Sequence, residues 1–217
     1  MEPDLKESSS HTPGWFAAHA ASRAEIYAML ATLLEQPPTE ELLQLLQNLQ
    51  GDEALPGKTG DAIAALRQAA QDSSPAELEE EFNSLFIGLG SGEMVPYASW
   101  YLEKRIQSSP LAALRSDLIE MGIVRQTDCH EPEDHAGILC EIMAILSRKP
   151  EVSPATEEQF YRRHIAPWMA TFFQDLQKAK SAEFYRPVGL LGSSFLVTEG
   201  EYLNRGTDTP NHKRRIS

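Results

Sequence analysis

The stretch PEDHAGILCEIMAIL, residues 132–146, decides the fold class of this sequence. After its proline, the side chains of one face recur three or four residues apart, at His135, Ile138, Leu139, Ile142, Met143 and Leu146. Because an α-helix repeats every 3.6 residues, this spacing predicts a helix rather than a strand. We therefore expect a helix that begins at Pro132 and closes before Pro150.

The same periodicity continues on both sides of that stretch. Apolar residues again fall three and four apart in Trp15–Glu35 and in the segment that starts at Thr39 and ends at Gly51. Serine followed by proline is typical of a helix start, since the hydroxyl caps a backbone N–H and proline needs none at the first position. This pair occurs at Ser74, Ser109 and Ser153. Further helices are expected over Gly60–Asp72, from Ser109 to Gly122, and over Glu183–Leu203.

Prolines and glycines interrupt the pattern at two places. Pro167 lies inside a helical segment, so we expect a kink or a break between two helices there. Over the last segment the helical signal is weakened by Pro187, Gly189, Gly192 and Gly200. No alternating stretch is long enough for a strand, and no repeat is found. The fold class is therefore all-α, a single helical domain of about nine or ten helices.

The chain has 217 residues, which predicts one domain. We expect this helical domain over residues 14–203, between a disordered N-terminus at 1–13 and a mobile polar tail with a basic cluster at 204–217. The first twelve residues lack the apolar core of a secretory signal, and no apolar run approaches the ~18 residues that span a bilayer. Only two cysteines occur. Such sparse usage fits a reducing compartment, so we expect a cytoplasmic protein.

The charge balance is strongly acidic. The formal net charge is −13, and the sequence pI is near 4.9. This argues against a surface that binds nucleic acid, because attraction to phosphate backbones depends on clustered Lys and Arg. An acidic surface instead favours basic partners.

Residues of the types that hold zinc occur in the loop before this helix and in the helix itself, at Cys129, His130, His135, Cys140 and Glu141. The two cysteines lack the close spacing of structural zinc sites, and a buried, small apolar role is the simpler interpretation of Cys140. The glycines after Ile87 are followed by no lysine and preceded by no strand, so neither phosphate-binding template fits. No Gly-x-Ser-x-Gly motif occurs. Enzymatic activity therefore has no support in the sequence.

The acidic stretch Glu131-Pro132-Glu133-Asp134-His135 stands at the start of the helix with which we began. Acidic side chains favour a helix N-terminus by about 0.3–1 kcal/mol, so capping is one interpretation. The other is that Asp134 and His135 stand at the mouth of a site, where they accept or donate hydrogen bonds to a cationic ligand. Local physics alone leaves both interpretations open.

A second group is aromatic, with Phe82 and Phe86 in one helix and Tyr97, Trp100 and Tyr101 after the glycine-containing loop. Aromatic residues at helical spacing usually belong to the core. Adjacent helical residues point about 100° apart, so Trp100 and Tyr101 cannot both face one core. At least one of them is expected to be partly exposed, where it would suit a peptide as an anchor.

Four stretches, in order along the chain, resemble signatures of one family, the TorD/DmsD (NarJ-like) redox-enzyme maturation chaperones. The first is Glu81–Gly88 together with Pro96–Leu102, and the second is Glu131–His135. The third is His164–Trp168, and the fourth is Phe184–Arg186. Together they extend over residues 80–190, so the resemblance covers about half of the chain.

This resemblance implies a cytoplasmic, all-helical chaperone without catalytic activity that serves a molybdopterin oxidoreductase. Such proteins bind the twin-arginine signal peptide of the enzyme precursor, hold back its export and assist cofactor insertion. By position, the apolar part of the peptide site is matched by Phe82, Leu85, Phe86, Tyr97 and Tyr101, and its loop by Pro132, Asp134 and His135. To these we add Trp100 and Glu131 from the residue chemistry. A leader with a basic portion and an apolar stretch needs carboxylates beside an apolar groove.

Several points stay open at this level. The resemblance does not decide which enzyme is the client, whether a homodimer forms, whether GTP or the molybdenum cofactor binds transiently, or whether the basic tail has a role. No resident cofactor, nucleic acid partner or stable membrane insertion is expected. The alternatives are a helical adaptor or scaffold protein and a small metal-dependent enzyme that uses the His/Cys/Glu cluster.

Overall fold

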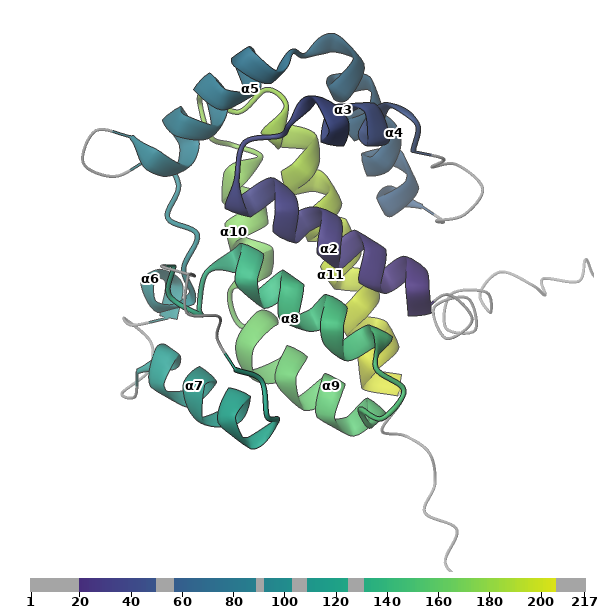
Figure 1. Cartoon of the computed structure of the whole chain (residues 1–217), viewed down its shortest axis with the longest axis vertical. Coiled ribbons are helices and arrows are strands. Elements are labelled where there is room, and N and C mark those ends of the chain that lie inside the picture. Colours follow the sequence, from purple (N-terminus) through teal and green to yellow (C-terminus); the bar gives the residue numbers. More distant parts are fainter. Residues whose placement is uncertain (1–19, 50–56, 89–91, 103–108, 125–130, 206–217) are drawn as a thin grey trace, which may run out of the picture.

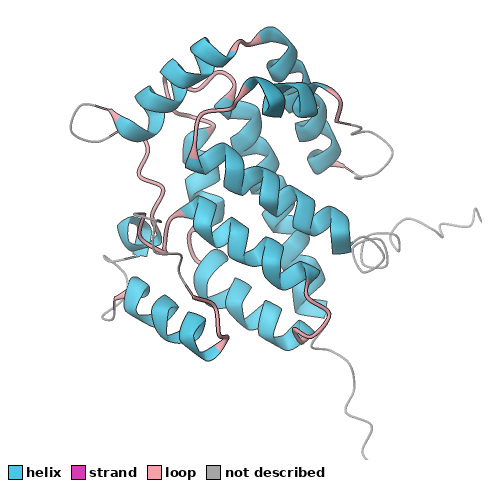
Figure 2. Ribbon diagram, viewed as in Figure 1, coloured by secondary structure: helices cyan, strands magenta, loops and turns pink. Residues whose placement is uncertain are grey.

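The computed structural model describes residues 20–49, 57–88, 92–102, 109–124 and 131–205. Within these ranges the chain forms ten α-helices, two π-helical turns and one isolated β-bridge, without a strand (Figure 2). The expected all-α fold with a single helical domain is confirmed. The helices are α2 (Ala20–Glu35), α3 (Glu40–Gln47), α4 (Lys58–Asp72), α5 (Pro75–Phe82), α6 (Ala98–Leu102), α7 (Pro110–Glu120), α8 (Ala136–Arg148), α9 (Pro154–Phe160), α10 (Met169–Leu176) and α11 (Tyr185–Arg205), with π-helical turns η1 (Asn83–Ile87) and η2 (Tyr161–Ile165).

Two antiparallel neighbours, α2 and α8, form the centre of the molecule (Figure 1). They pack on each other more extensively than any other pair of described helices, and α11 runs behind them against α10 and α4. Of the face that its periodicity predicts, Leu139, Ile142, Met143 and Leu146 are buried and Ile138 is half-buried. Smaller residues beside this face are buried as well, namely Ala136, Gly137, Cys140 and Ala144. Burial of such a face stabilises a helix far more than its intrinsic propensity does. None of the described helices is both long and apolar enough to cross a membrane.

The predicted helix starts are confirmed at all three Ser-Pro pairs. The Ser109 and Ser153 hydroxyls accept hydrogen bonds from backbone N–H groups of the first turn, at 3.4 and 3.1 Å. At Ser74 the Glu77 carboxylate accepts from the backbone N–H at 2.9 Å, which closes the capping box. Gly122 follows α7 with φ of +66°, the left-handed conformation that favours glycine.

The structure corrects one expected helix start, confirms one expected break and shifts one expected helix. Helix α8 begins at Ala136 rather than at Pro132, because the His135 side chain caps it and the preceding residues form a turn. The break at Pro167 is confirmed, since η2 ends before it and α10 starts after it. The helix expected over Glu183–Leu203 is α11 at Tyr185–Arg205, which has the same length, lies two residues further along and is unbroken despite Pro187 and its glycines.

Glycines in α11 allow it to approach α10 closely. A Cβ atom on Gly192 would lie 2.5 Å from the Phe173 ring, and one on Gly189 would lie 2.7 Å from the Phe173 carbonyl oxygen. Pro187 stands in the first turn, where a helix needs no intrahelical N–H partner. The two glycines that weakened the helical pattern therefore permit close helix packing.

A buried ion-pair network joins α2, α9 and α11. The Arg23 guanidinium, 2% exposed, donates to Glu157 at 2.6 Å and through Nε to Glu199 at 2.8 Å. The Glu157 carboxylate also accepts a hydrogen bond from Ser147 of α8 at 2.5 Å. Burial raises the pKa of Glu199, although Arg23 opposes that effect. These four residues hold the N-terminal part of α2 to the end of the chain's last helix.

Several predictions lie outside the described residues. They concern the N-terminus at 1–13, the start of the first helix at Trp15, the glycine stop at Gly51, and the tail beyond residue 205. Cys129 and His130, which were weighed as zinc ligands, also lie outside the described ranges.

Candidate functional site

The acidic loop and α6 are joined backbone to backbone. Tyr97 and His135 form the isolated antiparallel bridge. The Ala136 N–H donates to the Pro96 carbonyl at 2.8 Å, and the Ala98 N–H donates to the Asp134 carbonyl at 3.0 Å. The first and second signatures of the sequence, far apart along the chain, therefore meet at one place.

The Asp134 side chain fixes this junction. It is 1% exposed, and its Oδ2 atom accepts a hydrogen bond from the Ser99 N–H at 2.8 Å. Ser99 stands in the first turn of α6, so the carboxylate caps that helix and complements its dipole. The carboxylate holds α6 against the start of α8.

His135 is also turned inward. Its Nδ1 atom accepts a hydrogen bond from the Gly137 N–H at 3.1 Å, which caps α8. Burial lowers the pKa of this histidine, although the charges of Glu131 and Asp134 oppose the effect. The imidazole is therefore neutral near pH 7, with Nδ1 as acceptor and Nε2 as the protonated nitrogen. Its ring meets the Tyr97 ring edge to face, with centroids 5.2 Å apart.

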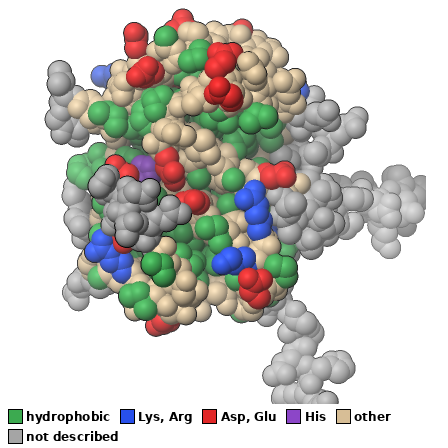
Figure 3. Space-filling view, in the orientation of Figure 1, with side chains coloured by type: hydrophobic (Ala, Val, Ile, Leu, Met, Phe, Trp, Pro, Cys, Tyr) green, Lys and Arg blue, Asp and Glu red, His purple; other side chains and the backbone are tan. Residues whose placement is uncertain are grey.

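The other two acidic side chains of the loop are less buried than that of Asp134. Glu131 is exposed and accepts a hydrogen bond from the Tyr97 hydroxyl. Burial, and then this contact, raise the pKa of Tyr97. Glu133 forms an ion pair with Arg115 of α7 at 2.8 Å. Figure 3 shows acidic and hydrophobic side chains beside a histidine on one face of the molecule.

The aromatic residues divide into separate contacts. Phe86 is half-buried and packs on Phe82 and Tyr185, with centroid distances of 5.0 and 5.3 Å. Tyr101 packs on Trp168 with centroids 5.4 Å apart. Trp100 is 63% exposed, as expected for one member of the adjacent pair. Of the other predicted site residues, Pro132 is half-buried and Leu85 is fully buried in the core.

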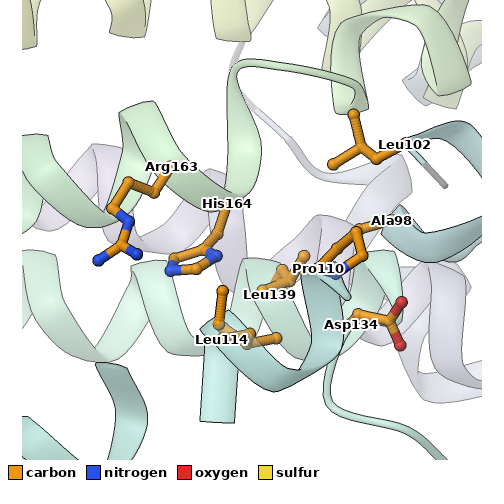
Figure 4. Close-up of a pocket in the computed structure, with 9 residues that line it drawn as sticks. Ala98, Leu102, Pro110, Leu114, Asp134, Leu139, Arg163 and His164 are labelled. Atoms are coloured by element: carbon orange, nitrogen blue, oxygen red, sulfur yellow. The ribbon is translucent and has the colours of Figure 1, made fainter. Parts of the chain in front are cut away.

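A cavity of about 170 Å³ lies between α6, α7, α8 and η2 (Figure 4). Of the ten residues predicted for the peptide site, only Asp134 lines it. Sequence reasoning gave no role to two further lining residues, Arg163 and His164. Both contact Asp117 of α7, through Nη1 at 2.8 Å and through Nε2 at 2.7 Å. Burial lowers the pKa of His164, against the opposing effect of Asp117. The third signature stretch begins at His164, which was the only sequence signal for it.

Sequence reasoning also missed the role of Glu81, the first residue of the first signature. Its carboxylate accepts hydrogen bonds from the backbone N–H groups of Glu183, Phe184 and Tyr185, at 2.8–3.1 Å. These groups begin α11, so Glu81 caps the last helix and ties it to α5. The first and fourth signatures are therefore two halves of one contact.

The zinc hypothesis finds no cluster among the residues that the structure describes, which hold no group of three His, Cys, Asp or Glu able to bind a metal. Cys140 is fully buried, with its sulfur 3.9 Å from that of Met169, and burial raises the pKa of its thiol. Glu141 is exposed, and His135 uses Nδ1 as a helix cap. Cys140 thus behaves as a small core residue.

Comparisons with known proteins agree on one relationship. A family model described as the nitrate reductase delta subunit matches residues 52–174. The probable Tat proofreading chaperone DmsD of Haemophilus influenzae is 32% identical over 62% of this chain, and the match spans 64% of that protein. The chaperone protein TorD of Aliivibrio salmonicida is 26% identical over 81% of this chain and 90% of its own length.

A solved structure shows the same fold. It is described as a putative redox enzyme maturation protein from Archaeoglobus fulgidus, and it covers 90% of this chain and 99% of its own with a TM-score of 0.51. The two sequences are 15% identical, so this likeness concerns the fold alone.

Proposed function

This chain belongs to the nitrate reductase delta subunit family, which includes the TorD and DmsD maturation chaperones, and on that premise we propose that it binds the twin-arginine signal peptide of a molybdopterin oxidoreductase precursor. The family is one of chaperones and not of enzymes. Binding of the leader would hold back export until the cofactor is inserted in the client enzyme. Since such precursors are made and filled before export, we place the protein in the cytoplasm.

The observation that supports this proposal best is the junction of the acidic loop with α6. It sets the exposed carboxylate of Glu131 next to Tyr97, and Tyr97 stands on the same short segment as the exposed Trp100. A twin-arginine leader carries a basic portion followed by an apolar stretch, and this surface offers both complements. The net charge of −13 adds long-range attraction for a basic peptide.

Within this proposal the buried and exposed residues have different roles. Glu131 and the aromatic rings of Tyr97, Trp100 and Tyr101 would contact the leader. Asp134 and His135 are too deeply buried to be its first contacts, so they would act as positioning residues that hold α6 and α8 in register. The half-buried Phe86 and Pro132 would add to the apolar surface, and the buried Phe82 and Leu85 would support the fold from the core.

Co-purification tests the proposal. We would express the full chain with an affinity tag in the cells that make it and identify bound proteins by mass spectrometry. The expected result is a molybdoenzyme precursor with its leader uncleaved, lost when the leader is deleted from the precursor gene. Recovery of no leader-bearing precursor, or equal recovery of the leaderless form, would contradict the proposal.

A further inference from the structure

The cavity between α6, α7, α8 and η2 has no role in the fold described so far. Its wall is largely apolar, and the residues that make up this part are Ala98, Leu102, Pro110, Ala113, Leu114 and Leu139. We propose that it binds one uncharged, apolar side chain of the leader peptide, of the size of leucine or phenylalanine. This inference rests on the proposed function and assigns it a specific subsite.

The basic side chains at the cavity already have a carboxylate partner, and Asp134 already accepts one hydrogen bond. Asp134 accepts from the Ser99 N–H, and both Arg163 and His164 contact Asp117. In Figure 4 the Asp134 carboxylate and the Arg163 guanidinium lie at opposite sides of the lining. An anionic occupant would need a partner that Arg163 and His164 do not offer without breaking their contacts with Asp117, and a buried unpaired charge is costly. The lining therefore disfavours an anionic side chain, and its largely apolar wall favours an apolar one.

The size of the cavity agrees with a single side chain. Its volume of about 170 Å³ is close to that of an engineered apolar cavity of ~150 Å³ in another protein, which binds benzene. A phenyl or isobutyl group would fill most of it. Two neighbouring side chains of a peptide would not fit together.

The cavity reaches the surface at the first turn of α7. Leu114 and Leu139 are buried, whereas Pro110 and Ala113 are half-buried, so the lining passes from interior to surface along that helix. Asp134 belongs both to the lining and to the acidic loop. A leader whose basic portion lies at the acidic loop can therefore place a residue of its apolar stretch here.

Filling the cavity from within tests this inference. In Ala113→Met, an unbranched side chain extends from α7 into the cavity, and methionine is a good helix former. We expect the affinity for a synthetic leader, measured by calorimetry, to fall at least tenfold while the unfolding temperature stays the same or rises. The control is Ala112→Met on the same helix, which is exposed and does not line the cavity. It should leave both quantities unchanged.

An Ala113→Met protein that is stable and binds the leader within twofold of wild type would overturn the inference and leave the proposed function standing. A wild-type protein that binds no leader would remove both.

A second measurement avoids the substitution altogether. Benzene added to the wild-type protein should shift the NMR signals of the Leu114 and Leu139 methyl groups, and saturating leader should reverse the shifts. Shifts that persist with bound leader, or no shifts at all, would contradict the assigned occupant.

Discussion

Substitution of Asp134 separates a positioning role from direct contact with the leader. The carboxylate is 1% exposed and accepts a hydrogen bond from the Ser99 N–H at 2.8 Å. A hydrogen bond to a charged group is worth about 1.5–3 kcal/mol, and a neutral one about 1 kcal/mol. Asp134→Ala should therefore lower the free energy of unfolding by about 2 kcal/mol. Asp134→Asn keeps an oxygen in place and should lower it by about 1 kcal/mol.

The effect on leader affinity should follow the same order. Without the cap, α6 loses its attachment to the start of α8, and the exposed Trp100 and its neighbour Tyr101 lose their fixed place. We expect Asp134→Ala to weaken leader binding at least tenfold and Asp134→Asn to weaken it less than threefold. Urea unfolding gives the stability, and isothermal titration calorimetry with a synthetic leader gives the affinity.

A distant acid provides the control for net charge. Glu151 lies exposed in the turn after α8, and Glu151→Gln removes the same charge without touching the junction. It should change neither stability nor affinity measurably. If Asp134→Asn loses as much affinity as Asp134→Ala, the negative charge itself contacts the leader, and the positioning role is refuted.

Three further predictions concern stability. Arg23→Met removes the ion-pair partner of the buried Glu199, so we expect the free energy of unfolding in urea to fall by about 3–5 kcal/mol. Adding Glu199→Gln should restore most of it. An unchanged free energy of unfolding in the single variant would contradict a network that stabilises the fold. Phe86→Ala removes a half-buried ring that contacts two other rings, so it should lower the free energy of unfolding by about 2 kcal/mol and weaken leader binding. If neither the stability nor the affinity changes, the ring belongs neither to the core nor to the site. Burial lowers the pKa of both His135 and His164, so their neutral forms stabilise the fold above pH ~6.5, and that stability is lost as the pH falls through the lowered pKa values. His135→Asn keeps a capping side chain and should flatten this part of a profile of unfolding free energy against pH. An unchanged slope would refute the assignment.

The sequence predicted well what depends on neighbouring residues. The Ser-Pro starts at Ser74, Ser109 and Ser153 were located correctly because capping involves atoms only two or three residues apart. The helical periodicity of 132–146 was also interpreted correctly. Its start was placed four residues early, because proline often opens a helix and a histidine cap is rare.

The sequence predicted poorly what depends on distant partners. The Arg23 contacts span 134 and 176 residues along the chain, and no local pattern marks them. The same holds for Glu81, whose three backbone partners lie more than 100 residues away. Gly192 weakened the helical pattern of the sequence, yet the helix is unbroken there. The glycine makes room for the Phe173 ring of another helix, which no local pattern indicates.

The peptide site stays a prediction, and the structure brings together only some of its residues. Tyr97 meets Glu131 and His135, whereas Phe82 and Phe86 pack near Tyr185. The burial of Asp134 was not foreseeable, because a carboxylate before a helix is equally suited to bind a ligand or to cap the helix. The cavity was not foreseen at all, because its walls come from four separate elements.

Calorimetric titration of the full chain with a synthetic leader of its own client tests the central claim most directly. The account predicts saturable one-to-one binding that weakens at least tenfold when the arginines become glutamine, and equally when the apolar stretch becomes serine. Binding should also weaken as salt is raised, because the protein is acidic and the leader basic. A scrambled leader of the same composition that binds as tightly as the natural one would contradict it.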